Sequence, residues 1–262
     1  MLNPGEYWNE VLENLPVSPE SKCSYFSDKQ SRMRFFFSHE QMPPDLLETA
    51  LAKGFRRCGD TYYSTSCNNC NLCISYRVST AEFKPSRSQK RCFKKNEDLH
   101  YKVVEPHKTK EKEDIYLKYQ YHQHFLRPAD ASTSKGSFNE KEQLETMTFQ
   151  MYTNPLNSRE LEIYLGDKLL GFGIIDIALE SISLVYFVFH PDYANRSLGK
   201  LNILYSIEWA LKEELKYVYL GYFIPGHMKM DYKSHFKPAE MLDSISGNWS
   251  YQLPELTGKK ES

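Results

Sequence analysis

The chain has 262 residues, of which 40% are hydrophobic and 14% aromatic, enough for one large domain or two ordinary ones with real cores. Its formal net charge of −1 excludes a protein that is basic throughout, so any nucleic-acid contact must come from a local patch. No apolar stretch approaches the roughly 20 residues that span a bilayer, and residues 1–17 lack the basic and apolar blocks of a signal peptide. We therefore expect a soluble, cytoplasmic protein with no membrane partner.

The first part of the chain, residues 1–98, predicts a small α+β unit. Its expected elements are a helix over 7–15, a strand over 31–37, a helix from Pro43 to about residue 53, strands over 55–63 and 74–80, and a helix over 86–96. Consecutive prolines favour the first turn of the second helix, and Gly54 ends it.

The second part, residues 99–262, predicts a more regular pattern. The expected order is a strand over 101–104, helices over 112–125 and 141–152, strands over 160–165, 169–179 and 181–189, a helix ending near 215, and a strand over 217–224. Two helices, three strands, a helix and a strand are the order of an N-acetyltransferase-like (GNAT) fold. We therefore predict an α+β chain with a mixed sheet, in which a GNAT-like acyltransferase domain over 99–262 follows a small cysteine-containing α+β domain over 1–98.

Three cysteines, Cys67, Cys70 and Cys73, form a C-x2-C-x2-C run. Two thiolates at this spacing reach one ion, and in a reducing compartment clustered thiols more often bind metal than form disulfides. A structural site needs a fourth ligand, for which Cys23 is the first choice and Cys58 and Cys92 are rivals. The sequence leaves zinc, an iron–sulfur cluster and unmetallated thiols open.

Residues 84–95 contain six cations and no acid. This local positive surface is suited to a phosphate backbone, and it predicts an RNA contact that positions without reading sequence. The residues expected to bind are Arg87, Ser88, Gln89, Lys90, Arg91, Lys94 and Lys95. The alternative is an ordinary solvated helix face.

A short polar loop, residues 195–200, follows the third strand of the second part. It resembles a loose version of the GNAT phosphate-binding loop Arg-x-x-Gly-x-Gly/Ala, although the second glycine is missing. Backbone N–H groups at such a helix start bind phosphates. The alternative is that Ser197 only caps the following helix.

Four separated blocks of this sequence resemble the arginyl/leucyl-tRNA–protein transferase family. They are residues 54–60 with the cysteine run, 83–91, 185–199 and 219–233, and the resemblance extends from Cys23 to Trp249. The size and the triple-cysteine run are most similar to the bacterial aspartate/glutamate leucyltransferases. Two residues depart from the family pattern: Cys58 stands where a serine is expected, and Asp231 stands where a neutral or basic residue is usual.

This resemblance implies an enzyme that moves an amino acid, leucine rather than arginine, from aminoacyl-tRNA to the α-amino group of proteins beginning with Asp or Glu. The product would be a signal for degradation by the N-degron pathway. The reaction is aminolysis of an ester. A free α-amine has a pKa of about 7.7–8.0, so the enzyme needs mainly to position the reactants and stabilise the oxyanion. No cofactor and no nucleophilic side chain is required for this chemistry.

The resemblance also implies roles for individual residues. We expect Lys229 and Lys233 to bind the acceptor carboxylate, Tyr222, Tyr232 and Tyr186 to orient the amine or the ester, His122 to move a proton, and Arg196, Ser197 and Gly199 to meet the terminal adenosine or phosphate of the tRNA. Core packing is the alternative role of the tyrosines, and a surface position that of His122. The rival functions are arginyl transfer, an acetyl-CoA-dependent N-acetyltransferase, and a zinc-knuckle RNA-binding module without turnover.

Overall fold

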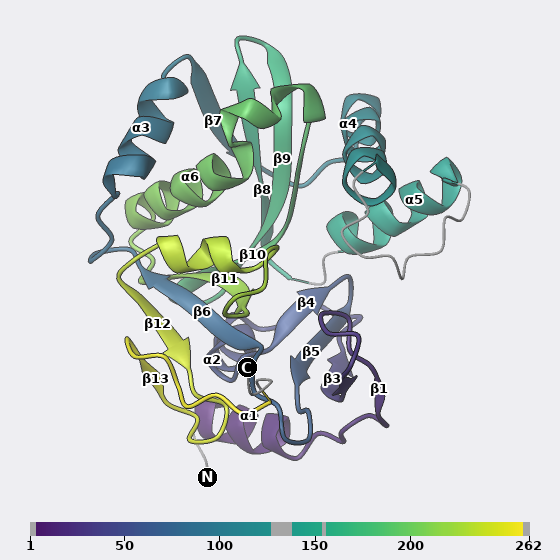
Figure 1. Cartoon of the computed structure of the whole chain (residues 1–262), viewed down its shortest axis with the longest axis vertical. Helices are drawn as coiled ribbons and strands as arrows, with labels where there is room; N and C mark the ends of the chain where they lie inside the picture. Colours follow the sequence, from purple (N-terminus) through teal and green to yellow (C-terminus); the bar gives the residue numbers. More distant parts are fainter. Residues whose placement is uncertain (1–3, 127–137, 154–155, 259–262) are drawn as a thin grey trace.

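The structure is a computed structural model that describes residues 4–126, 138–153 and 156–258. A mixed eight-stranded sheet lies beside a separate three-stranded sheet (Figure 1). The larger sheet has the order β13 (Trp249–Ser250), β12 (Ala239–Leu242), β6 (Ile74–Ser79), β11 (Tyr217–Phe223), β10 (Ser181–Phe189), β9 (Lys168–Ile177), β8 (Ser158–Leu165) and β7 (Leu99–Val104). Only β10 and β11 pair in parallel in this sheet. In the described ranges, no helix is long and apolar enough to cross a membrane.

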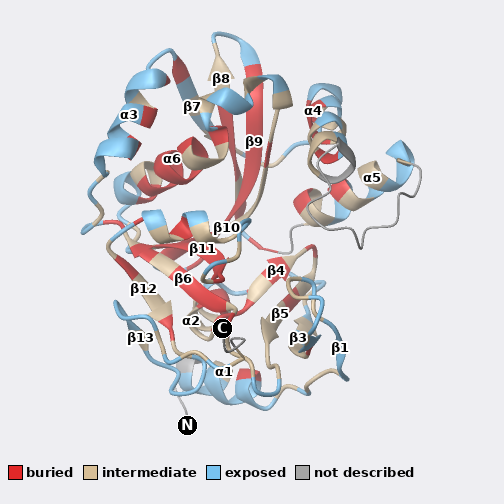
Figure 2. Ribbon diagram, viewed as in Figure 1, coloured by how far each residue is buried: buried red, intermediate tan, exposed pale blue. Residues whose placement is uncertain are grey.

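Helices cover both faces of the larger sheet because β9 is apolar on both of its faces. Leu170 and Ile175 of β9 pack in one core with α6 (Leu198–Lys212), whereas Phe172 and Ile174 pack in another with α4 (Lys110–Gln120) and α5 (Glu140–Met147). Strand β9 is accordingly buried along most of its length (Figure 2). The helices α4 and α5 continue into the π-helical turns η1 (Tyr121–Leu126) and η2 (Thr148–Tyr152). Strands buried on both faces are expected to be continuously hydrophobic, as β9 is.

The three-stranded sheet has the order β3 (Met33–Phe37), β5 (Thr61–Thr65) and β4 (Arg56–Cys58), and all its pairs are antiparallel. One continuous strand over 55–63 was therefore the wrong prediction, because the chain reverses at Gly59. Gly59 has φ +62°, and a Cβ there would lie 2.4 Å from the ring of Phe149, so both the turn and the packing require glycine. The remaining α-helices and β-strands are α1 (Pro4–Glu13), β1 (Ser21–Lys22), β2 (Gln30–Ser31), α2 (Pro44–Ala52) and α3 (Arg87–Lys95), and two 3-10 helices are η3 (Pro191–Arg196) and η4 (Asp231–His235).

The order of elements after residue 99 confirms the predicted GNAT-like α+β arrangement. The larger sheet also takes in β6, which precedes that residue, between β12 and β11. Strands from both expected units thus share one sheet, and the division between residues 98 and 99 stays a prediction about how the chain folds. The short strands β12 and β13 are additions that the sequence pattern did not indicate.

Candidate active site

A cavity of about 360 Å³ lies where β10 and β11 separate. The two strands pair only from Ser181 with Tyr217 to Ser183 with Tyr219. Beyond that point each strand has an irregularity against its other neighbour, between Leu184 and Tyr186 on β10 and after Tyr219 on β11. A bulge bends its strand and increases the local twist, which parts the two strands. The opening in the middle of the sheet lets side chains from both strands reach one ligand.

Six of the residues predicted for substrate binding or catalysis line this cavity: Tyr186, Gly199, Tyr222, Lys229, Tyr232 and Lys233. His122, Arg196 and Ser197 are not among the lining residues. Three cations line the cavity, and none of its described lining residues is Asp or Glu. The site is therefore suited to a ligand that carries negative charge.

Arg56 is the lining cation that the sequence analysis did not assign. Its Nη1 donates to Ser183 Oγ at 3.1 Å and its Nη2 donates to the carbonyl oxygen of Leu184 at 2.6 Å. Gly221 has φ +83°, and a Cβ at that position would lie 2.9 Å from Arg56 Cζ. Both hydrogen-bond partners are neutral, so the guanidinium is held in place while its charge remains available to a ligand. The sequence pointed to this region through residues 54–60, which resemble the family. That block contains two arginines, and it gave no reason to choose Arg56 as a binding residue.

Lys233 lines the cavity from η4 (Asp231–His235) and is 7% exposed. Its Nζ donates to the carbonyl oxygen of Tyr222 at 2.6 Å. Burial, with a smaller contribution from the Arg56 guanidinium, lowers the pKa of Lys233 to about 7. Lys229, four residues earlier, is exposed at the rim of the same cavity. The two predicted lysines therefore differ: one is buried and tied to the backbone, and the other can meet an incoming carboxylate.

The three predicted tyrosines also differ in what their hydroxyls contact. The hydroxyl of Tyr222 donates to the carbonyl oxygen of Gly54 at 3.2 Å and accepts from the N–H of Thr65 at 3.3 Å. Tyr222 is 6% exposed, and burial raises its pKa far above the usual range. Tyr186 accepts a hydrogen bond from Gln120 Nε2 at 2.9 Å, and Tyr232 is 44% exposed. Tyr222 thus joins β11 to the three-stranded sheet, whereas Tyr186 and Tyr232 can face a ligand.

The loop before α6 reaches the same cavity through Gly199. Ser197 has the left-handed φ of 57°, and no side chain caps the start of α6. An uncapped helix start leaves backbone N–H groups for an anionic ligand. Arg196 instead pairs with Asp98, at 2.7 Å between Nη1 and Oδ1. The alternative role of Ser197, capping α6 with its side chain, is not seen in this described helix, which favours the phosphate-binding interpretation of the loop.

Helix α3 ends against this loop. Lys95 Nζ donates to the carbonyl oxygen of Asn195 at 2.7 Å, and Asn96 Nδ2 donates to that of Arg196 at 3.0 Å. The exposed polar residues of the helix are Arg87, Ser88, Lys90, Arg91, Lys94 and Lys95. Gln89 is different: it is 2% exposed, its Oε1 accepts from the N–H of Ser86 at 2.7 Å, and its Nε2 donates to the carbonyl oxygen of His235 at 3.1 Å. Gln89 therefore caps α3 and ties it to η4, and it does not face a tRNA.

The four predicted metal ligands come from two segments of the chain. Burial, together with the nearby Cys23, Cys67 and Cys70, raises the pKa of Cys73 to about 12. The N–H of Tyr25 donates to Cys23 Sγ at 3.5 Å. Thiolates are ligands of zinc and of iron–sulfur clusters, but among the described residues no three of these four sulfur atoms lie within 4.8 Å of one another. Of the alternative ligands, Cys92 packs in the core with α6, as a small apolar residue does.

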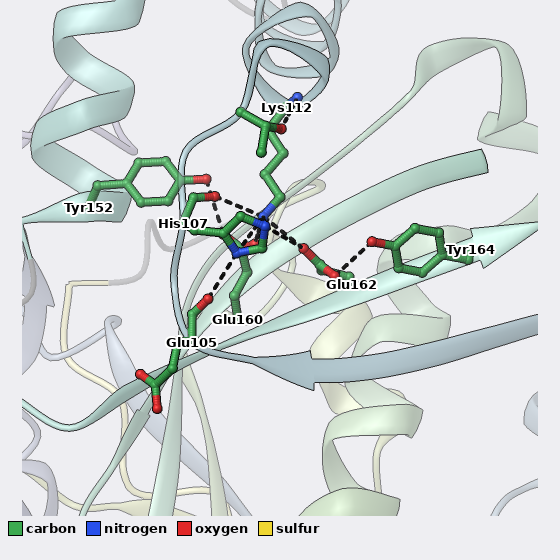
Figure 3. A network of polar contacts seen from close by, with 8 residues as sticks. Glu105, His107, Lys112, Tyr152, Glu160, Glu162 and Tyr164 are labelled. Atoms are coloured by element: carbon green, nitrogen blue, oxygen red, sulfur yellow. Dashed lines mark hydrogen bonds and ion pairs between the residues drawn. The ribbon is translucent and has the colours of Figure 1, made fainter. Parts of the chain in front are cut away.

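A buried ion cluster outside the cavity holds α4 against the sheet (Figure 3). Among the described residues, one group of potential metal ligands has its ligand atoms within 4.8 Å of one another, and it consists of His107, Glu160 and Glu162. The ammonium of Lys112 contacts both carboxylates, with 2.7 Å to Glu162 Oε1, and supplies the positive charge that a metal would bring. Two tyrosine hydroxyls complete the cluster, Tyr152 on Glu160 at 3.0 Å and Tyr164 on Glu162 at 2.8 Å. Burial raises the pKa of Glu160 above its usual range. We interpret this cluster as structural.

A splayed strand pair, a cationic cavity and an uncapped helix start together define an acyltransferase of the GNAT-like class. Residues 21–91 match the family model described as "Arginine-tRNA-protein transferase, N terminus", and residues 111–243 match "Arginine-tRNA-protein transferase, C terminus". The chain therefore belongs to the arginine-tRNA-protein transferase family and is an aminoacyltransferase.

Curated relatives agree with this family. The chain is 40% identical over 238 residues to the "Aspartate/glutamate leucyltransferase" of Leptospira interrogans, covering 90% of this chain and 89% of the relative. It is 36% identical over 246 residues to the protein of the same name from Stenotrophomonas maltophilia, covering 92% and 93%. Among solved structures, that of L-PGS from Bacillus licheniformis aligns with a TM-score of 0.42 at 12% identity, over 90% of this chain and 88% of that one. That likeness is too low to bear on function.

Proposed function

We propose that this protein transfers leucine from leucyl-tRNA to the α-amino group of proteins that begin with Asp or Glu. The observation that carries the proposal is the charge of the cavity, with three basic side chains, Arg56, Lys229 and Lys233, and no carboxylate among its described lining residues. An Asp or Glu side chain brings the complementary charge. The relatives named "Aspartate/glutamate leucyltransferase" support the same assignment. The product would be a degradation signal in the cytoplasm.

In this proposal Arg56 and Lys229 bind the acceptor carboxylate. Arg56 lines the cavity and is held by Ser183 and Leu184, and Lys229 is an exposed lining residue. A guanidinium that is fixed before the ligand arrives loses little side-chain entropy on binding. Lys233 lies deeper and adds positive potential when it is protonated.

The leucyl-tRNA would approach from the side of α3. The exposed cations of that helix lie next to the loop before α6, because Lys95 contacts Asn195. Phosphates of the acceptor stem would bind these cations, and the terminal adenosine would reach the uncapped start of α6 at Gly199. This path places the ester of the charged tRNA in the cavity between β10 and β11.

The reaction in the cavity forms an amide bond and breaks the ester. The neutral α-amine attacks the carbonyl carbon, the C–O bond to the ribose breaks, and the ribose hydroxyl leaves with a proton. With a pKa of about 7.7–8.0, roughly a tenth of the amine is neutral at pH 7, so holding the two reactants together is the main task. The backbone at the β10 bulge, where Val185 lines the cavity, is the proposed donor to the oxyanion.

The apolar part of the cavity favours leucine as the amino acid that is transferred. Its lining includes Ile174, Leu184, Val185, Phe187, Ile203 and Leu220. An arginine side chain would instead need an acidic partner, and the described lining offers none. Arginyl transfer, the second candidate, is therefore disfavoured by the same observation.

The test is transfer of radiolabelled leucine or arginine from charged tRNA to reporter proteins that begin with Asp, Glu, Ala or Lys. We expect label from leucyl-tRNA on the Asp and Glu reporters. Arg56→Met should lower transfer to them about 10- to 100-fold, since it removes charge-assisted hydrogen bonds. Arg159→Met, which removes a surface ion pair with Glu105, is the matched control and should transfer normally. Label from arginyl-tRNA alone, or equal label on the Ala reporter, would refute the proposal.

We also propose that Cys23, Cys67, Cys70 and Cys73 hold a structural zinc ion or iron–sulfur cluster. The support is the C-x2-C-x2-C spacing of three of these cysteines and the nearness of Cys23, Cys67 and Cys70 to Cys73. Elemental analysis of protein purified without oxygen should find zinc, or iron with sulfide, and Cys73→Ser should lose it and melt at a lower temperature. Cys92→Ser is the control and should retain the metal. Metal-free wild-type protein with an unchanged melting temperature would contradict this site.

A further inference from the structure

One face of the three-stranded sheet contributes residues to the cavity and extends beyond it. Arg56 pairs with Tyr63 across β4 and β5, and Tyr63 pairs with Phe35 across β5 and β3. Residues that pair directly across strands project from the same face, and so do residues two apart on one strand. Arg56, Tyr63, Phe35 and Phe37 therefore lie on one face.

The opposite face of the same sheet is packed into the protein. Phe36 stacks on Tyr62 with ring centroids 4.8 Å apart, and Tyr62 is 1% exposed. Arg57 points to that side as well, where it pairs with the buried Asp176. Successive side chains along β3 and β4 thus point alternately into the protein and away from it. Phe35 and Phe37 lie on the face that points away.

The face formed by Arg56, Tyr63, Phe35 and Phe37 begins in the cavity and ends in solvent. Arg56 and Tyr63 line the cavity, whereas Phe35 is 38% exposed and Phe37 is 57% exposed. The two phenylalanine rings meet edge to face at 5.6 Å, and Phe37 stacks on His39. Two strand spacings of about 4.8 Å separate Arg56 from Phe35, a span that about three residues of extended peptide cover. A chain whose first residue is held at Arg56 would therefore meet these rings with its third and fourth residues.

The chemistry of this face fits a polypeptide and does not fit a tRNA. Beyond Arg56, the described residues of this face are Met33, Phe35, Phe37, Cys58, Thr61, Tyr63 and Thr65, which carry no cation for phosphates. The exposed cations of α3 lie beside α6, away from β3 (Figure 1). The two substrates must approach one cavity from different sides, and the neutral aromatic side remains for the acceptor protein.

We propose that Phe35 and Phe37 form a docking surface for the third and fourth residues of the acceptor polypeptide, with a preference for apolar side chains there. The inference rests on the proposed function, since it takes the acceptor's first residue to lie at Arg56. Recognition would then extend past the N-terminal Asp or Glu. Proteins with the same first residue would differ in how well they are modified.

The test compares two synthetic peptides that begin with Asp and carry either Leu or Ser at positions three and four. For the wild-type enzyme we expect kcat/KM from leucyl-tRNA to be about ten-fold higher on the Leu peptide, as partial burial of one or two leucines allows. Phe35→Ser with Phe37→Ser should bring the ratio to about one and leave kcat/KM on the Ser peptide unchanged. Phe37→Ser alone, at the more exposed position, should lower the ratio part of the way. Leu179→Ser, at a 63% exposed residue in the turn between β9 and β10, should keep the wild-type ratio.

Equal wild-type rates on the two peptides would overturn this inference while leaving the proposed function intact. Weaker binding of leucyl-tRNA by the double variant, measured by filter binding, would assign the face to the nucleic acid and also overturn it. No transfer by the wild-type enzyme to either Asp-starting peptide would refute the proposed function itself, and the docking surface with it.

Discussion

The buried ion pair between Arg57 and Asp176 fastens β4, and with it Arg56, to the larger sheet. Arg57 Nε donates to Asp176 Oδ2 at 2.7 Å and Nη2 donates to Oδ1 at 2.8 Å, with the side chains 2% and 1% exposed. Arg57 Nη1 also donates to the carbonyl oxygens of Gly59 at 2.7 Å and Thr153 at 3.0 Å. The change Arg57→Met retains much of the side-chain volume and leaves the Asp176 carboxylate buried without its cation. We expect this variant to be strongly destabilised.

The magnitude follows from the burial and the bidentate geometry. Breaking a buried pair by removing one partner costs about 3–5 kcal/mol of unfolding free energy. With a urea m-value of about 3 kcal/mol/M for a chain of this size, the midpoint should fall by about 1–1.7 M. Arg57→Met combined with Asp176→Leu should recover part of this loss, because it removes the uncompensated charge.

Urea unfolding followed by tryptophan fluorescence and far-UV circular dichroism measures these midpoints. Lys216→Met is the matched control, since it breaks an ion pair with Glu180 whose side chains are 60% and 49% exposed. We expect the control to unfold at the wild-type midpoint. If Arg57→Met moves the midpoint no further than this control does, the ion pair does not hold the two sheets together. If the double variant is as unstable as Arg57→Met, lost packing rather than buried charge is the cause.

Two further predictions concern the cavity. The free energy of unfolding of the wild-type protein should rise between pH 7 and 10.5. Lys233 loses its proton near pH 7 in the folded state and near pH 10.5 in the unfolded state. In this window the unfolded state therefore binds one more proton, and raising the pH favours the folded state. Lys233→Met should flatten that rise in urea midpoints; an equal rise in the variant would exclude Lys233 as its source. Gly221→Ala should cost about 1–2 kcal/mol, since φ is +83°, and raise KM for Asp-starting peptides, since the new Cβ would displace Arg56. Gly166→Ala, with φ +56° and open space, should lose stability without raising KM, and the same KM change in both variants would contradict the contact with Arg56.

Local sequence signals were sufficient for most of the elements. The apolar run of β9 and the capping box of α3 act within a few residues, and their bounds follow from residues that are neighbours in the chain. Gly59 shows the limit of such signals, because a turn inside an apolar stretch depends on one φ angle. A strand as short as β12 has too few residues to show a hydrophobic period. It forms because it pairs with β6, which lies far away in the sequence.

The candidate site divides in the same way. Residues 219–233 lie close together in the chain, and four of the predicted side chains, Tyr222, Lys229, Tyr232 and Lys233, reach one cavity from this block alone. Arg56 reaches the same cavity from 127 residues before Ser183, its hydrogen-bond partner. Gln89 carries the sequence signature of a polar surface residue but turns inward, since its amide finds partners in Ser86 and His235.

The sequence by itself determined the family, the order of most of the elements and the residue types that the chemistry needs, because each of these is encoded in contiguous blocks. The tertiary structure alone decided which cations face the cavity, which tyrosine hydroxyls are already bonded, and which face of β3 is open. The physical reason is that burial and hydrogen bonding depend on partners from distant segments. Nothing in the neighbourhood of Lys233 along the chain indicates that its ammonium is buried beneath the carbonyl of Tyr222 and loses its proton near neutral pH.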